Sequence, residues 1–175
     1  MTITCFTGKV REEELAQLGL ATFRANPRIC LLGDTGRRRL PIFSFMIRHA
    51  DRDASSWFRC VRSSSDACLR MKYFHHNFVC ALLNDLFGVQ ARAGCQCAGP
   101  YGIRLLQIPD DSLPKIKQKI DGNQLIIKPG FCRLSLAFFM SDAEVKYILD
   151  AVIFLADNAA AFLPYYQPHL SSAEW

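Results

Sequence analysis

The sequence predicts an α+β fold, in which helices pack on one face of a small and mostly antiparallel sheet. Helical apolar periodicity alternates with short apolar runs along the chain, in the order α-β-β-α-β-α-β-α. Half of the 175 residues are hydrophobic and 21% are charged, which is typical of a globular chain. Neither an internal repeat nor a Gly/Ser-rich linker divides the sequence, so we expect a single domain over residues 1–175.

The first predicted helix spans residues 12–25. Three glutamates, at 12–14, stand where the positive end of a helix dipole favours acidic side chains. Pro27 ends the helix, because the residue before a proline disfavours helical backbone. Gly19, in the middle, weakens the helical pattern.

Two strands are predicted next, at residues 28–32 and 40–47, with a turn between them. Their closeness in sequence favours antiparallel pairing. The second strand is apolar on both faces, so we expect it to lie at the centre of the sheet. Residues 48–72 show little periodicity and are interpreted as a surface insertion.

The strongest helical pattern covers residues 74–87 and has a wide apolar face. Gly88 follows it, as expected for the residue after a helix C-terminus. The remaining predicted elements are a strand at 89–92, a short apolar run at 103–108, a helix at 110–121, an extended segment at 125–127, a strand at 131–139, and a last helix opened by a capping box at 141–144.

The strand predicted at 131–139 alternates in polarity. Cys132 and Leu134 project to one side of a strand, and Arg133 projects to the other. Arg133 is therefore predicted to lie on the face opposite the apolar core.

The chain contains eight cysteines. No apolar run reaches the roughly 20 residues of a membrane span, and the N-terminus does not resemble a signal or transit peptide. We therefore predict a cytoplasmic location, with reduced thiols and no membrane partner. The pair Cys95 and Cys97 has no second pair at zinc-finger spacing, which disfavours a structural zinc site.

Positive charge is concentrated between Arg37 and Lys72, where nine basic residues face three aspartates. Such a segment could bind phosphate-rich partners, which makes nucleic-acid binding one alternative function. The same stretch is rich in Ser and Asp, so a solvated surface explains it better. We do not expect nucleic acid as a partner.

Residues 90–102 combine one cation, two thiols, three glycines and a proline. A loop with this much backbone freedom can present a reactive thiol, which a packed core does not need. The alternative is that the thiols are inert loop residues.

A resemblance to a known family is carried by this loop and by the C-terminal strand. Residues 92–98 resemble the Arg-x-Gly-x-x-Cys-Ala loop of cysteine desulfurases and selenocysteine lyases. Residues 128–135 and 140–145 resemble the closing strand and helix of the same class V aminotransferase family, and residues 74–77 and 82–88 also fit it.

Enzymes of that family depend on pyridoxal phosphate and have fold type I. A large domain holds the cofactor on a Schiff-base lysine, and a small C-terminal domain closes over the substrate. The resemblance implies that this chain is the small domain only. None of its seven lysines stands in the setting of the family's cofactor lysine. Pyridoxal phosphate is therefore not expected to bind this chain alone, and catalysis by the isolated chain is not expected.

The resemblance also implies site residues and partners. Cys97 matches the nucleophile that takes sulfur from the substrate, and Arg133 matches the arginine that clamps the substrate α-carboxylate. Arg92 would join the substrate site and favour the thiolate. An amino-acid substrate would bind through a large domain elsewhere, in a homodimer or on a partner chain. Two alternatives stay open: Arg133 could pair with a neighbouring Asp, and the chain could be a non-catalytic binding or scaffold protein.

Overall fold

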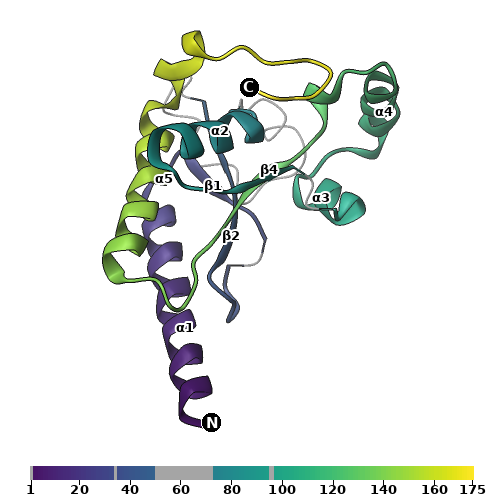
Figure 1. The fold of residues 1–175 in the computed structure, drawn as a ribbon. Coiled ribbons are helices and arrows are strands. Elements are labelled where there is room, and N and C mark those ends of the chain that lie inside the picture. The colour runs from purple at the N-terminus through teal and green to yellow at the C-terminus, as the bar shows by residue number, and fades with distance from the viewer. Residues whose placement is uncertain (1, 34, 50–72, 95–96) are drawn as a thin grey trace.

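The computed structural model describes residues 2–33, 35–49, 73–94 and 97–175 (Figure 1). Most of the predicted insertion, 48–72, and Cys95 lie outside the described residues.

The described part of the chain forms one four-stranded sheet. It consists of β1 (Ile29–Leu31), β2 (Ile42–Ile47), β4 (Phe131–Ser135) and β3 (Arg92–Gly94), in that spatial order. Every neighbouring pair is antiparallel. The predicted α+β class is confirmed, and β2 lies inside the sheet as its two apolar faces predicted.

Three long helices cover one face of this sheet: α1 (Thr2–Ala25), α2 (His76–Phe87) and α5 (Asp142–Phe162) (Figure 1). Phe43 and Phe45 of β2 point into this layer and are fully buried. Burying such aromatic side chains is the main contribution to stability in a core of this kind. The buried core also contains Leu15, Leu20, Phe23, Phe78, Val79, Leu82, Leu83, Cys132, Leu134, Val145, Leu149, Val152 and Leu155.

The first helix is longer than predicted, because α1 begins at Thr2 and not at residue 12. The glutamates at 12–14 therefore lie in the middle of the helix, where two of them are stabilised by ion pairs and not by the helix dipole. The Glu13 carboxylate lies 3.0 Å from the Arg38 guanidinium, and the Glu14 carboxylate lies 3.6 Å from the Arg11 guanidinium.

Gly19 has a packing role that the sequence did not reveal. A Cβ added at Gly19 would lie 2.3 Å from Cζ of Phe43, well inside van der Waals contact. The absence of a side chain thus lets the Phe43 ring lie directly against the backbone of α1. The contact between α1 and β2 therefore requires glycine at position 19, although glycine weakens the helical pattern of the sequence.

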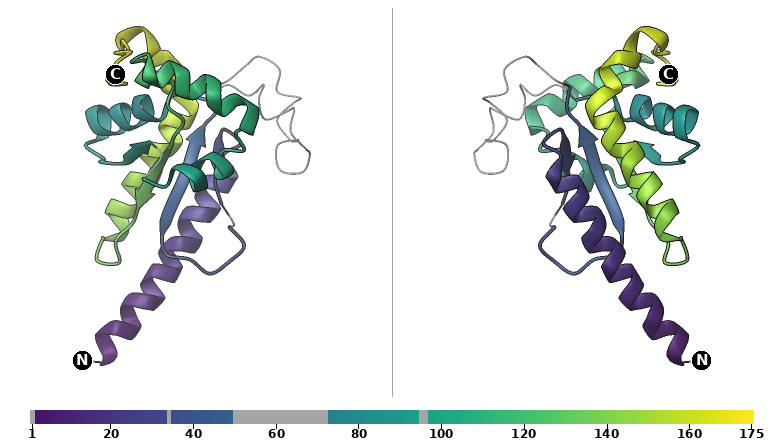
Figure 2. Two further views of the ribbon diagram at one scale, coloured as in Figure 1. Left: turned by 90° about the vertical axis from the view of Figure 1, so that its right-hand side faces the viewer. Right: turned by 90° about the vertical axis from the view of Figure 1, so that its left-hand side faces the viewer.

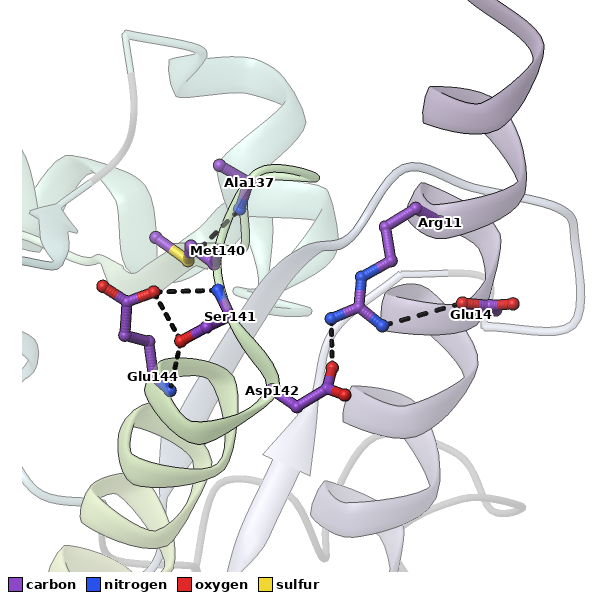
Figure 3. Close-up of polar contacts among 7 residues, drawn as sticks. All are labelled: Arg11, Glu14, Ala137, Met140, Ser141, Asp142 and Glu144. Atoms are coloured by element: carbon purple, nitrogen blue, oxygen red, sulfur yellow. Dashed lines mark hydrogen bonds and ion pairs between the residues drawn. The ribbon is translucent and has the colours of Figure 1, made fainter. Parts of the chain in front are cut away.

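The start of α5 is fixed by the predicted capping box (Figure 3). The Ser141 hydroxyl accepts a hydrogen bond from the Glu144 N–H at 3.3 Å, and the Glu144 carboxylate accepts one from the Ser141 N–H at 2.8 Å. The Ser141 hydroxyl also donates a hydrogen bond to the Glu144 carboxylate at 2.8 Å, and the bonds that this carboxylate accepts from the Ser141 N–H and hydroxyl lower the pKa of Glu144. Next to the cap, Asp142 pairs with Arg11, which ties the start of α5 to α1.

Residues 142–165 are long and apolar enough to cross a membrane by length and composition alone. One side of α5 packs on α2 and α1 and contributes seven buried residues to the core. A core helix in a water-soluble fold has the same composition.

The opposite side of the sheet carries a separate unit, which we call the α3–α4 hairpin (Figure 2). It comprises α3 (Gly99–Leu105), η3 (Asp110–Ser112), α4 (Leu113–Asp121) and η4 (Leu125–Ile127). The prediction of an extended segment at 125–127 is therefore wrong, since this segment is a 3-10 turn. The first half of the apolar run predicted at 103–108 belongs to α3, because a short apolar run does not distinguish a strand from a buried helix turn.

Candidate functional site

Two arginines lie side by side at one end of the sheet. Arg92 of β3 is registered directly opposite Arg133 of β4, and Arg133 is opposite Ser44 of β2. Residues opposite one another in an antiparallel pair project to the same face, so these three side chains form a row. Cys132 and Leu134 point into the helical core, which places the row on the other face, as the alternation of β4 predicted.

This arrangement is electrostatically unfavourable by itself. Like charges directly opposite on neighbouring strands destabilise a sheet. Arg133 is half-buried, and its guanidinium makes no hydrogen bond or ion pair with any residue in the described part of the chain. The expected alternative, a pairing of Arg133 with a neighbouring Asp, is therefore not found among those residues. An anion bound between Arg92 and Arg133 would relieve the repulsion.

Cys97 lies beside this pair of arginines. Its Sγ is 3.4 Å from Nη2 of Arg92, and its side chain is exposed to solvent. The Cys97 backbone has φ of 60°, a left-handed conformation that is uncommon for a residue other than glycine. The sequence expected Arg92 and Cys97 to be neighbours, and the structure places them in contact.

Glycines set the position of the loop that carries Cys97. Gly94, the last residue of β3, has φ of 103° and turns the chain out of the sheet. A Cβ on Gly130 would lie 2.6 Å from Cα of Gly94 and 2.4 Å from Nε2 of His76. The end of β3 and the segment before β4 are therefore in close contact, in the same register that places Arg92 opposite Arg133.

The two histidines at the start of α2 have structural roles. Nδ1 of His75 accepts hydrogen bonds from the Asn77 N–H at 3.2 Å and from Nε1 of Trp175 at 3.0 Å. Burial, together with the nearby His76, lowers the pKa of His75 from 6.5 to about 4. His76 contacts the Asn77 side chain and the Lys128 carbonyl. Both histidines therefore act as capping or packing groups at the start of α2.

Cys30, Cys80 and Cys132 are more shielded than Cys97. Cys132 is buried and Cys80 is half-buried, with their Sγ atoms 3.9 Å apart. A hydrogen bond between them lowers the pKa of Cys80, and the same hydrogen bond together with burial raises the pKa of Cys132. Cys30 is half-buried.

The lysines of the described residues do not fit pyridoxal phosphate. A Schiff-base lysine is held in a shielded site beside the other cofactor-binding groups. Every lysine in the described part is exposed, and Lys146 pairs with Asp150. The exposed lysines are Lys9, Lys115, Lys117, Lys119, Lys128 and Lys146. We therefore derive no reaction step through this cofactor.

The sequence did not reveal a pocket in the α3–α4 hairpin. Its signals were weak: Ile116 and Ile120 stand one helical turn apart, and residues 103–108 form an apolar run. Predicting the pocket required knowing that this run is helical and faces α4.

The sequence matches no protein-family model and none of the curated proteins. The residues of the site therefore carry the functional argument.

Proposed function

We propose that this chain is the small, C-terminal domain of a pyridoxal-phosphate-dependent protein of the class V aminotransferase and cysteine desulfurase type. The observation that carries the proposal is the meeting of Arg92, Arg133 and Cys97 at one end of the sheet. A sulfur-transferring site needs a group that binds the substrate carboxylate and a thiol within reach of the substrate sulfur. The resemblance of residues 92–98 and 128–135 to this family supports the same assignment.

The two arginines would bind the substrate α-carboxylate. A guanidinium group matches a carboxylate in shape and can donate two parallel hydrogen bonds to it. Arg133 is half-buried, so its charge is less screened by water than that of a fully exposed arginine. Arg92, which also contacts Cys97, would hold the carboxylate and the thiol in one geometry.

Cys97 would accept sulfur from a bound substrate. In the simplest reaction the Cys97 thiolate attacks the outer sulfur of a small persulfide. The S–S bond of the donor breaks, a new S–S bond forms on Cys97, and the donor leaves as a thiolate that takes up a proton. The exposed position of Cys97 would then let the persulfide pass to an acceptor thiol.

The cofactor would be held by a large domain, either in a homodimer or on a partner chain, and the isolated chain would not be catalytic. The location would be cytoplasmic. The exposed lysines of the described residues favour one second candidate, a non-catalytic binding or scaffold protein that kept the fold.

Persulfide uptake tests the proposal. The purified chain is mixed with cysteine persulfide, which carries a carboxylate, or with thioglycerol persulfide, which has none, and sulfur on each cysteine is followed by peptide mass spectrometry. We expect Cys97 to acquire sulfur first. Arg133→Gln should slow uptake from cysteine persulfide about tenfold, the effect of losing a charged hydrogen bond, and leave thioglycerol persulfide unaffected.

Arg104→Gln is the matched control, because Arg104 is exposed on α3 and lies outside the arginine row. Equal uptake by Cys97 and the shielded thiols, or equal rates with both donors, would reject the sulfur-transfer site and leave the scaffold function.

A further inference from the structure

The α3–α4 hairpin contains a pocket of about 570 Å³. Its walls are almost entirely apolar and come from both helices, with Ile103 on α3, Leu106 directly after α3, and Leu113, Ile116 and Ile120 on α4. This volume lies within the range of small-molecule sites, roughly 300–1,000 Å³, and the apolar lining is typical of them.

The hairpin does not bury this pocket by itself. Ile116 and Ile120 are only half-buried, although they form the apolar side of α4. The principal contacts of α4 are with the short turns η3 and η4, so the helical core does not cover its apolar side. Apolar side chains left half-exposed at one site gain free energy when a ligand removes them from water.

Two lysines give the pocket a preference for negative charge. Lys117 of α4 and Lys128, just after η4, both line it, whereas Asp110 is the one acidic residue in its lining. Neither lysine forms an ion pair with any residue that the structure describes. A ligand with one anionic end would therefore find a charged partner at the edge of an apolar site.

We propose that the α3–α4 pocket binds a small amphipathic anion, with its apolar body between Ile103 and Ile116 and its anionic group at Lys117 and Lys128. A monocarboxylate with a medium-length aliphatic tail is the simplest member of this class. The pocket uses none of Arg92, Arg133 or Cys97, so this inference stands or falls separately from the sulfur-transfer function.

Two fluorescent probes test the site on the full chain. The first, 8-anilino-1-naphthalenesulfonate, has an apolar body and one negative charge. The second, N-phenyl-1-naphthylamine, has the same aromatic body without the charge. We expect the anionic probe to bind one site per chain more tightly than the neutral probe, and decanoate to displace it competitively.

Single substitutions test whether the probe binds in the α3–α4 pocket. Lys117→Glu and Lys128→Glu should each weaken binding of the anionic probe about threefold to fivefold, as expected for one ion pair at the protein surface. Binding of the neutral probe should be unaffected. Lys115→Glu is the matched control, because Lys115 is exposed on the same helix but does not line the pocket. Ile116→Phe should fill the cavity and weaken both probes. Arg133→Gln should affect neither.

Three results would overturn the proposal. Equal losses from Lys115→Glu and Lys117→Glu would mean that the probe responds only to overall charge. Unchanged binding in Ile116→Phe, with the far-ultraviolet circular dichroism of the parent chain, would place the probe elsewhere. Probe binding that falls as the chain self-associates would show that a second copy occupies the pocket.

Discussion

The two faces of the sheet are built in opposite ways. On the helical face, Phe43, Phe45 and Ile47 of β2 are fully buried under α1, α2 and α5. On the other face, Ser44 and Arg133 are half-buried, Arg92 is exposed, and the α3–α4 hairpin leaves an apolar pocket open. The apolar side chains of the helical face are buried by the fold itself. The other, open face holds two neighbouring arginines and half-buried apolar side chains that a ligand or partner could contact. We therefore propose that the helical face provides stability and that the open face provides function.

The largest effect should come from truncating a buried side chain on the helical face. Phe78 is fully buried against Phe74 and Trp175, so Phe78→Ala should lower the free energy of unfolding by about 3–5 kcal/mol. Ile116→Ala, in the half-buried wall of the open pocket, should cost no more than about 1 kcal/mol. Urea denaturation of both variants measures the difference. Similar losses would mean that the hairpin belongs to the same cooperative core.

A smaller effect should follow from adding one methyl group at the helix–sheet contact. Gly19→Ala improves helix propensity, but its Cβ would clash with the Phe43 ring, and we expect a net loss of about 1–3 kcal/mol. Gly8→Ala on the same helix is the control. Its Cβ would have no atom within 4 Å, so this change should stabilise the chain by up to about 1 kcal/mol. Thermal unfolding compares the two, and a stabilised Gly19→Ala would contradict the contact.

The smallest effect concerns His75, where α2 meets the C-terminal residue Trp175. The pKa of His75 is about 4 in the folded chain and 6.5 ordinarily, so between these values the unfolded chain binds more protons. The stability that comes from keeping His75 neutral in the folded chain is fully present above pH 6.5 and is lost as the pH falls towards 4. The loss should be about 1–2 kcal/mol, less than for a fully buried histidine.

Denaturant titrations at pH 7 and at about pH 4.5 measure this loss, and His75→Asn supplies the control. Asparagine caps helices well but does not titrate, so this variant should lose less stability on acidification. An equal pH dependence in both chains would exclude His75 as the source.

Much of the helical face could be predicted from the sequence. The apolar periods of α2 and α5, the capping box at Ser141 and Gly88 at the end of α2 are local signals, and each holds in the structure. The start of α1 was predicted wrongly because three glutamates in a row are also stable in mid-helix when arginines pair with them.

The open face was predictable only in part. The alternation of β4 placed Arg133 away from the core, and the loop at 90–102 indicated an accessible thiol. That Arg92 and Arg133 lie opposite one another depends on strand register, and the same register brings Gly94 close to Gly130. Such a contact between residues far apart in sequence leaves no periodic pattern, and neither does the apolar pocket between two short helices.

The most direct test of the arginine–thiol site compares two alkylating reagents. Iodoacetate carries a carboxylate and iodoacetamide is neutral, so the ratio of their rates at Cys97 reports whether a carboxylate is bound beside the thiol. The unfolded chain supplies the reference ratio, and Arg104→Gln is the control variant. If Arg92 and Arg133 bind the carboxylate, the ratio in the folded chain should exceed the reference about tenfold, and Arg92→Gln or Arg133→Gln should reduce it towards the reference. A ratio equal to that of the unfolded chain, unchanged by either substitution, would contradict the account.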